Sequence, residues 1–139
     1  MKVFLGGTCN ESTWRDRLIK QLKIDYYNPV VEDWTEECMA EEIRQRESCD
    51  FVLYVITPFM TGTYAIAEAV DDSNKRPDKT MFLFLTCDIN ESGEGKEFTE
   101  GQIRSLNQVS KMIESNGATV FCSLNQLGLY LNSREYVKK

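Results

Sequence analysis

Glu68 and Tyr64 are the side chains whose types and spacing first indicate chemistry in this sequence. They stand four residues apart in an alanine-rich segment, which follows the apolar run Phe51–Thr57 and a turn containing Pro58 and Gly62. Residues four apart are neighbours on one face of a helix, so the Tyr64 phenol is predicted to reach the Glu68 carboxylate. A buried strand, a turn and a helix bearing a carboxylate are typical of ligand sites in α/β proteins. The alternative is that Glu68 is an exposed acid of a capped helix.

The sequence contains no histidine, which restricts the possible chemistry. Ser-His-Asp and Cys-His catalysis and histidine-based metal sites are excluded. A helix carboxylate beside a sheet is then suited to attack or stabilise an oxocarbenium-like carbon, as at the anomeric centre of an N-glycosidic bond. Departure of a nucleobase also needs a proton donor or a hydrogen bond, a role that Glu42 or Asp33 could fill. The alternative for Glu42 is an ordinary surface acid.

The elements that must position these residues alternate between strand and helix patterns. Such alternation predicts a parallel sheet with helices on both faces. Right-handed crossovers then predict a three-layer, flavodoxin/Rossmann-like α/β fold with a five-stranded sheet of order 2-1-3-4-5. The polar, glycine-containing segment 87–101 is predicted as a surface loop. The five predicted strands are residues 2–6, 24–28, 51–57, 80–86 and 118–121.

The helix expected before the third strand carries a second acid. Asp33 or Thr35 can cap its start. Met39 and Ile43 are four residues apart and are predicted to face inward. Glu42 is their neighbour on the helix surface, so it should lie at the edge of that buried stripe.

A ligand crevice is predicted at the carboxyl ends of the first and third strands, where the strand order reverses. This arrangement brings Gly6, Gly7 and Thr8 beside the turn at residues 57–63, with Glu68 looking toward the crevice. Glycines at this position allow the backbone to approach a ligand closely. The alternative is that they only form a tight turn.

Composition narrows the function classes further. A length of 139 residues predicts a single domain spanning residues 1–139. A net charge of −6 argues against a nucleic acid polymer as the partner and favours a small molecule. No apolar run approaches the roughly 18 residues of a membrane span, and the opening MKVFLGGTCN does not read as a signal peptide, so a cytoplasmic protein is expected. Five scattered cysteines without a CxxC motif argue against disulfides and a zinc site, and neither a metal nor a cofactor is predicted.

Four segments resemble one known family. VFLGGT, DYYNPVVEDW, EEIRQRESCDFVLYVITPFMTG and YAIAEAVDDSNKRP, in this order, resemble the nucleoside 2-deoxyribosyltransferase-like family, in particular a short branch with a VFLGGT opening and a DDSNKRP tail. The resemblance covers about Lys2 to Leu85. It implies an enzyme that acts on nucleosides or nucleotides.

The resemblance also implies roles for individual residues. In the family, a helix glutamate eighteen residues after the aspartate that opens the third strand is the nucleophile on C1′ of the deoxyribose; Asp50 and Glu68 have this spacing here. A family acid eight residues before that aspartate contacts the base, and Glu42 occupies the matching position.

Two positions differ from the family pattern. Phe4 stands where the family has a tyrosine that orients the nucleophile, and we hypothesise that Tyr64 supplies the missing phenol. Gly62 stands where the family has an aspartate that helps to hold the sugar. The sequence therefore does not specify which sugar the substrate carries.

Three functions are therefore compatible with the sequence. The first is cleavage or exchange of the N-glycosidic bond of a (deoxy)nucleoside through a covalent glycosyl-Glu68 intermediate. The second is an N-glycosidase that hydrolyses nucleoside 5′-monophosphates, and the third is a module that binds a nucleotide-like ligand without turnover. The resemblance further implies a homo-oligomer, because the family tends to complete its sites with a segment from a neighbouring chain.

Overall fold

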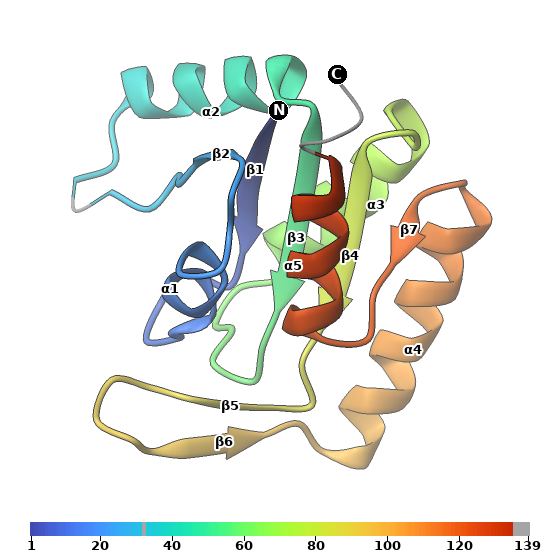
Figure 1. Ribbon diagram of the computed structural model, residues 1–139. Coiled ribbons are helices and arrows are strands. Elements are labelled where there is room, and N and C mark those ends of the chain that lie inside the picture. Colours follow the sequence, from blue (N-terminus) through green and yellow to red (C-terminus); the bar gives the residue numbers. More distant parts are fainter. Residues whose placement is uncertain (32, 135–139) are drawn as a thin grey trace.

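Strand β3 (Phe51–Ile56) is buried along its whole length and forms the centre of the sheet. Its β-branched and aromatic residues favour an extended conformation, and it contains no charged residue that would need water. In this computed structural model, which describes residues 1–31 and 33–134, β3 pairs in parallel with β1 (Lys2–Gly7) and β4 (Thr80–Phe84) (Figure 1).

Two short strands complete the sheet. β2 (Asp25–Tyr27) pairs in parallel with β1, and β7 (Thr119–Val120) pairs in parallel with β4. The resulting order is β2-β1-β3-β4-β7. Since β7 is the fifth strand of this sheet along the chain, the predicted 2-1-3-4-5 order and the three-layer α/β fold are confirmed.

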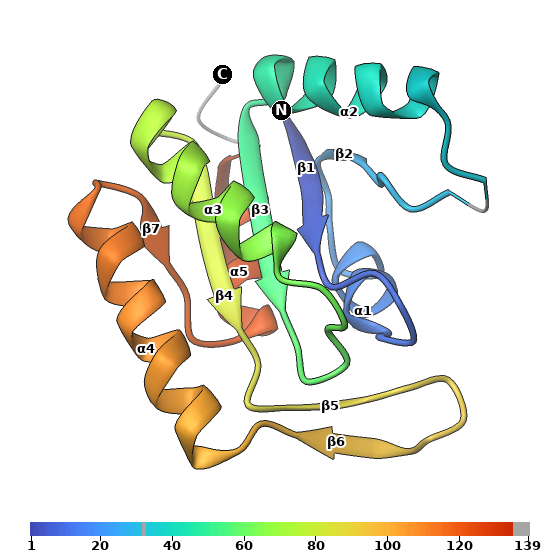
Figure 2. The same ribbon diagram turned by 180° about the vertical axis from the view of Figure 1, so that it is seen from behind.

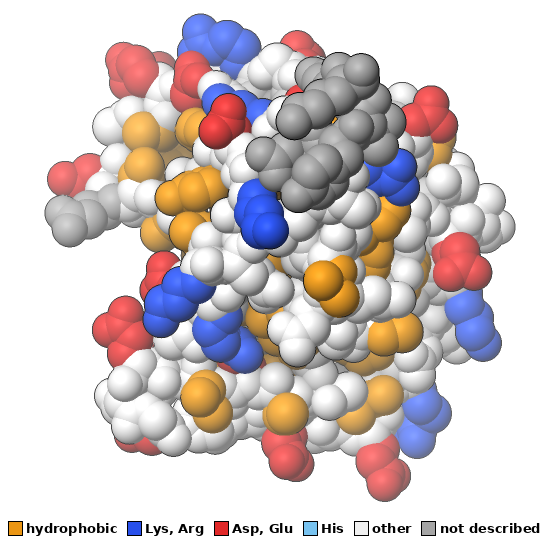
Figure 3. Space-filling model, viewed as in Figure 1, with side chains coloured by type: hydrophobic (Ala, Val, Ile, Leu, Met, Phe, Trp, Pro, Cys, Tyr) orange, Lys and Arg blue, Asp and Glu red, His pale blue; other side chains and the backbone are white. Residues whose placement is uncertain are grey.

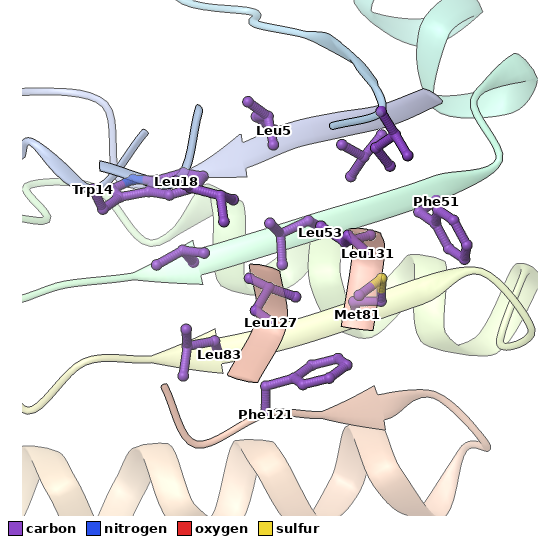
Figure 4. Close-up of a cluster of buried hydrophobic side chains, with 13 residues drawn as sticks. Leu5, Trp14, Leu18, Phe51, Leu53, Met81, Leu83, Phe121, Leu127 and Leu131 are labelled. Carbon is purple, nitrogen blue, oxygen red and sulfur yellow. The ribbon is translucent and has the colours of Figure 1, made fainter. Parts of the chain in front are cut away.

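Helices cover both faces of the sheet. On one face, α1 (Trp14–Ile19) and α5 (Leu124–Ser133) pack through Trp14, Leu18, Leu127 and Leu131, all fully buried (Figure 4). On the opposite face lie α3 (Tyr64–Lys75) and α4 (Glu100–Ser115) (Figure 2). The small side chain of Ala69, which is also fully buried, lets α3 lie close to the sheet.

Helix α2 (Glu36–Ser48) does not pack as the sequence predicts. No residue of α2 is buried, and Met39 and Ile43 are 42% and 50% exposed. The prediction that these two side chains face inward is therefore wrong. The reason is the position of the helix, which runs along the amino-terminal end of the strands rather than over a face of the sheet (Figures 1 and 2).

Segment 87–101 is also more ordered than a surface loop. It contains an antiparallel hairpin of β5 (Cys87–Ile89) and β6 (Gly95–Glu97), followed by the start of α4. Asp88 is 4% exposed and accepts hydrogen bonds from Ser12 Oγ at 2.5 Å and Arg17 Nη2 at 2.6 Å. These contacts join residues more than seventy positions apart, so local sequence gives no sign of them.

None of the described helices has the length and apolar character of a membrane span.

Candidate functional site

Two adjoining cavities open at the carboxyl ends of β1 and β3, where the sequence predicts a crevice. The first has a volume of about 290 Å³ and the second a volume of about 250 Å³. Among the residues that the structure describes, Glu68 is the one carboxylate-bearing residue that lines both cavities, so it lies where they adjoin. The residues common to the two linings are Gly7, Cys9, Asn10, Ala65 and Glu68.

Glu68 lies in the second turn of α3 and is only partly exposed, with 22% of its side chain accessible. Its Oε2 atom forms an ion pair with Nη1 of Arg46 at 3.1 Å. Burial raises the pKa of Glu68, the charge of Arg46 opposes this increase, and the acids Glu42 and Asp72 add to it. The carboxylate therefore combines a partly apolar environment with a fixed cation.

Arg46 is itself held firmly. Its Nε and Nη2 atoms donate to the two oxygens of Asp72 at 3.2 and 3.0 Å, a bidentate geometry that fixes the guanidinium plane. Asp72 is fully buried, and it also accepts from Tyr54 Oη at 2.6 Å and pairs with Arg76 Nε at 3.3 Å. Burial lowers the pKa of Arg46, but the hydrogen bonds to Asp72 and the electrostatic interactions with Tyr54, Asp72 and Glu68 together outweigh this effect and raise the pKa, so Arg46 stays charged.

The sequence reasoning missed this network. It singled out neither Arg46 nor Asp72. One signal was available in the spacing: Arg46 is four residues after Glu42, and Asp72 is four residues after Glu68, so each shares a helix face with a predicted site acid. The convergence of the two helices on Tyr54 was not visible in the sequence.

The first cavity combines apolar side chains with an acid. Val30, Val31 and Trp34 line it from the segment between β2 and α2, and Glu42 lines it from α2. Trp34 is 59% exposed. Burial raises the pKa of Glu42, and the charges of Arg46 and Arg15 oppose this increase. The structure thus brings Glu42 and Glu68 to one cavity.

The second cavity contains the other predicted residues of the turn before α3. Thr61, Gly62 and Tyr64 line it together with Glu68. Tyr64 is 72% exposed, and the structure gives no hydrogen bond between its phenol and Glu68, whose carboxylate pairs with Arg46 instead. A Cβ atom added at Gly62 would meet no heavy atom within 4 Å, so this position has open space.

Gly6 and Gly7 line the first cavity, and their glycine character has reasons within the protein. A Cβ at Gly6 would lie 2.8 Å from the ring of Tyr54. Gly7 has a φ of +117°, in the left-handed region, and a Cβ there would overlap the backbone of Val55. The two glycines therefore allow β1 and β3 to pack closely at the floor of the site.

Thr8 connects the two loops of the site rather than pointing freely into it. It is 5% exposed, its Oγ1 atom accepts from Thr57 N at 2.9 Å, and its backbone N donates to Val55 O at 2.9 Å. Its carbonyl oxygen accepts from Arg15 Nη1 at 2.5 Å and from Trp14 Nε1 at 2.8 Å. Arg15, which the sequence reasoning did not single out, thus holds the loop after β1 and also lines the first cavity.

Asp33 is exposed and lines neither cavity. The cap of α2 is Thr35, whose side chain accepts from Cys38 N at 3.2 Å. Of the two acids that the sequence offers as donors to a leaving base, the structure therefore brings only Glu42 to the site.

Across the described residues, no group of three or more Cys, Asp or Glu side chains could hold a metal ion.

The family described as nucleoside 2-deoxyribosyltransferase like matches residues 1–76, which is more than half of the 139 residues. This segment runs from β1 to the end of α3 and includes both helices of the Arg46–Glu68 pair. Searches of the curated proteins and of the solved structures gave no significant match.

Proposed function

Because this chain belongs to the nucleoside 2-deoxyribosyltransferase-like family, we propose that it cleaves or exchanges the N-glycosidic bond of (deoxy)nucleosides through a covalent glycosyl-Glu68 intermediate. One observation carries this proposal: within residues 1–31 and 33–134, Glu68 is the one carboxylate-bearing residue shared by two adjoining cavities. A substrate with one half in each cavity would have its central bond beside this carboxylate. A nucleoside has this form, with a flat base on one side of C1′ and a sugar on the other.

The lining of the first cavity supports its assignment to the base. Val30, Val31 and Trp34 offer an apolar surface, and an indole stacks favourably on a flat heterocycle. Glu42 in the same cavity can form a hydrogen bond to the base or give it a proton. The raised pKa of Glu42 favours the protonated form that this second role needs.

The chemistry proceeds in two displacements. In the first, a Glu68 oxygen donates an electron pair to C1′, and the bond from C1′ to the base nitrogen breaks. The leaving base takes the electron pair of the broken bond and a proton from Glu42. In the second, the nitrogen of another base attacks C1′ and gives its proton to the Glu42 carboxylate, while the bond between C1′ and Glu68 breaks and its electron pair returns to the Glu68 carboxylate. Two inversions give net retention at C1′.

Hydrolysis of nucleoside 5′-monophosphates, with water as the acceptor, is the second candidate. It is favoured by the start of α3, where Thr63 forms no side-chain capping bond. Ile66 N and Ala67 N bond to Thr63 O, which leaves the backbone N–H groups of Tyr64 and Ala65 open beside the second cavity. Such helix amino termini attract phosphate.

The test is incubation of the protein with a deoxynucleoside and a second free base, and separately with nucleoside 5′-monophosphates, followed by chromatography. A new nucleoside indicates transfer, whereas free base and free sugar alone indicate hydrolysis. No product, together with a thermal shift on ligand addition, would contradict an enzyme and support the binding module.

A pair of variants isolates the role of Glu68. Glu68→Gln should abolish both turnover and the glycosyl adduct detected by mass spectrometry of the intact protein. Asp71→Asn is the matched control, since Asp71 is on the same helix, has 49% of its side chain exposed and pairs with Lys75 at 2.9 Å. Activity in the Glu68→Gln variant close to that of the control would refute the assignment.

We also propose that a second copy of the chain is its protein partner. Exposed apolar side chains gather on α2 and β2, where Met39, Ile43 and Tyr26 are 42%, 50% and 43% exposed (Figure 3). Trp34, at the rim of the first cavity, extends this surface to the site. A homo-oligomer whose sites are completed by a neighbour is also what the family resemblance implies.

A further inference from the structure

The ion pair between Arg46 and Glu68 has a feature that a surface salt bridge lacks, because only one partner is able to move. Arg46 has 16% of its side chain accessible and is bound at Nε and Nη2 by the fully buried Asp72. Its Nη1 atom remains to contact Glu68 Oε2. The guanidinium is thus a fixed point against which the carboxylate orients.

Three elements converge to hold that fixed point. Arg46 comes from α2, Asp72 from α3 and Tyr54 from the central strand β3. Tyr54 Oη donates to Asp72 at 2.6 Å inside the core, where both residues are essentially inaccessible. A buried carboxylate without partners is costly, so Arg46 and Tyr54, together with Arg76, stabilise the buried charge of Asp72.

We propose that Arg46, clamped by Asp72 and Tyr54, is the positioning residue for Glu68: it fixes Oε2 and leaves Oε1 as the attacking oxygen. This inference rests on the proposed function and states how its nucleophile is oriented. Within the described part of the chain, the pair with Arg46 is the one polar contact given for the Glu68 carboxylate. Oε1 is therefore without a protein hydrogen bond that an attack on C1′ would have to break.

The same contact serves both displacements. When Oε1 forms the ester bond to C1′, Oε2 becomes the carbonyl oxygen and keeps its contact with Arg46 Nη1. When the acceptor attacks C1′, the electron pair of the ester bond returns to the carboxylate, and the Arg46 charge stabilises it as a leaving group. Arg46 stays protonated throughout, so no proton is lost or gained at this residue.

Phe4, in the first strand β1, is consistent with Arg46 being the residue that orients Glu68. Phe4 stacks on Tyr27 with ring centroids 5.7 Å apart and has no hydroxyl group with which to orient Glu68. Tyr54, the nearest buried phenol in the network, is committed to Asp72. A guanidinium from α2 therefore provides the orientation that a phenol would otherwise provide.

Charge on Glu68 should also depend on Arg46. Among the described residues, the ionisable groups that interact with Glu68 are Arg46 and Glu42 from α2, Asp72 from its own helix and the Tyr54 phenol from β3. Burial and the two acids raise the pKa of Glu68, whereas Arg46 lowers it. If Arg46 is replaced by a neutral residue, only the raising influences remain, and the carboxylate should take up its proton at a higher pH.

The test is a titration of Glu68 by NMR of protein labelled with ¹³C at the glutamate carboxyl groups, in wild type, Arg46→Gln and Arg46→Lys; a Glu68→Gln spectrum assigns the signal. In Arg46→Gln the midpoint should move up by about one pH unit. Arg46→Lys should keep most of the wild-type midpoint, because it keeps the charge. Arg44→Gln is the matched control, since Arg44 is on the exposed face of α2 and pairs with Glu41.

A kinetic measurement separates this inference from the proposed function. For a nucleoside that the enzyme turns over, the acid limb of the pH profile of kcat/KM should shift together with the NMR midpoint. Arg46→Lys should lower kcat about tenfold with little change in KM, because a lysine cannot form the bidentate contact with Asp72. An unmoved NMR midpoint in folded Arg46→Gln would overturn the inference. Absence of turnover in wild type would instead refute the proposed function, and the titration would still test the ion pair.

Discussion

Tyr54 Oη donates a hydrogen bond of 2.6 Å to Asp72 Oδ2, and the two residues are 1% and 0% exposed. This bond joins the centre of the sheet to the helix that carries Glu68. Asp72 in turn binds Arg46, whose remaining nitrogen pairs with Glu68. The candidate nucleophile is thus connected to the core of the fold through two intermediate side chains.

Tyr54→Phe should destabilise the protein by about 1–3 kcal/mol, because the buried Asp72 Oδ2 atom loses one of its two hydrogen-bond donors. The measurement is the free energy of unfolding in urea. Tyr26→Phe is the matched control, since Tyr26 is 43% exposed on the edge strand and should tolerate the change. Equal stability of the two variants would mean that the buried bond contributes nothing.

Trp34→Ala should weaken binding of the base about tenfold, because stacking on the indole is lost, while kcat changes little. Trp34→Phe should retain most of the affinity. The chain has two tryptophans, and Trp14 is fully buried, so quenching of the exposed Trp34 by a free base can be followed directly. Undiminished affinity in Trp34→Ala would place the base elsewhere.

Gly62→Asp should increase activity on deoxynucleosides by lowering KM about tenfold, because a charged acceptor for the sugar hydroxyls is restored. The substitution should not affect folding, since a Cβ at Gly62 meets no atom within 4 Å. Gly62→Asn has the same shape without the charge and serves as the control. If both variants have wild-type KM values, the second cavity does not hold the sugar.

Glu42→Gln should remove part of the pH dependence of stability. The folded-state pKa of Glu42 is raised above its ordinary value of 4.5, so the folded protein binds this proton more readily than the unfolded chain. Stability therefore falls as the pH rises from the ordinary to the raised value, and the fall should be smaller in the variant. Glu68 contributes with the same sign and stays in place.

The measurement for Glu42 is urea unfolding at a series of pH values across that window. Glu41→Gln is the control, because Glu41 neighbours Glu42 on α2 and pairs with Arg44. If Glu42→Gln and Glu41→Gln lost the same amount of stability with rising pH, the pKa of Glu42 would be the same in the folded and unfolded states.

Ile43→Glu should convert an oligomer into a monomer, because it places a charge at the centre of the apolar surface on α2. Light scattering after size-exclusion chromatography measures the mass. Leu129→Glu is the control, since Leu129 is 71% exposed on α5, away from that surface. A monomeric wild-type protein would refute self-association through this face.

Much of the fold could be predicted because its signals are local. The run Phe51–Ile56 is apolar and β-branched or aromatic, which is typical of a buried parallel strand wherever it occurs. Alternation with helices and the right-handed crossover rule then limit the strand order. The predictions for Met39 and Ile43 failed because an apolar pair on a helix does not reveal whether the helix lies over a sheet or beside its end.

Glu68 and Glu42 were predicted from the sequence because strand–turn–helix geometry and family spacing both indicate them, and the structure brings both to one cavity. Arg46 and Asp72 were not predicted, because a charged residue in a helix pattern is usually solvated. Their burial depends on two helices meeting over Tyr54, which is a contact between segments eighteen or more residues apart. For Tyr64, helical spacing predicted a contact between its phenol and Glu68, but the side chain is exposed and the structure shows no such hydrogen bond.

The sequence alone determined the order of the sheet, because periodicity and turn residues along one chain carry that information. Together with the family resemblance, it also predicted the end of the sheet at which a ligand would bind and the carboxylate that would act there. Only the tertiary structure decided what Glu68 faces. Glu68 pairs with Arg46 from α2, which is bound to Asp72 from α3 and, through it, to Tyr54 from β3. The energy of that cluster depends on distances across the fold that no local pattern encodes.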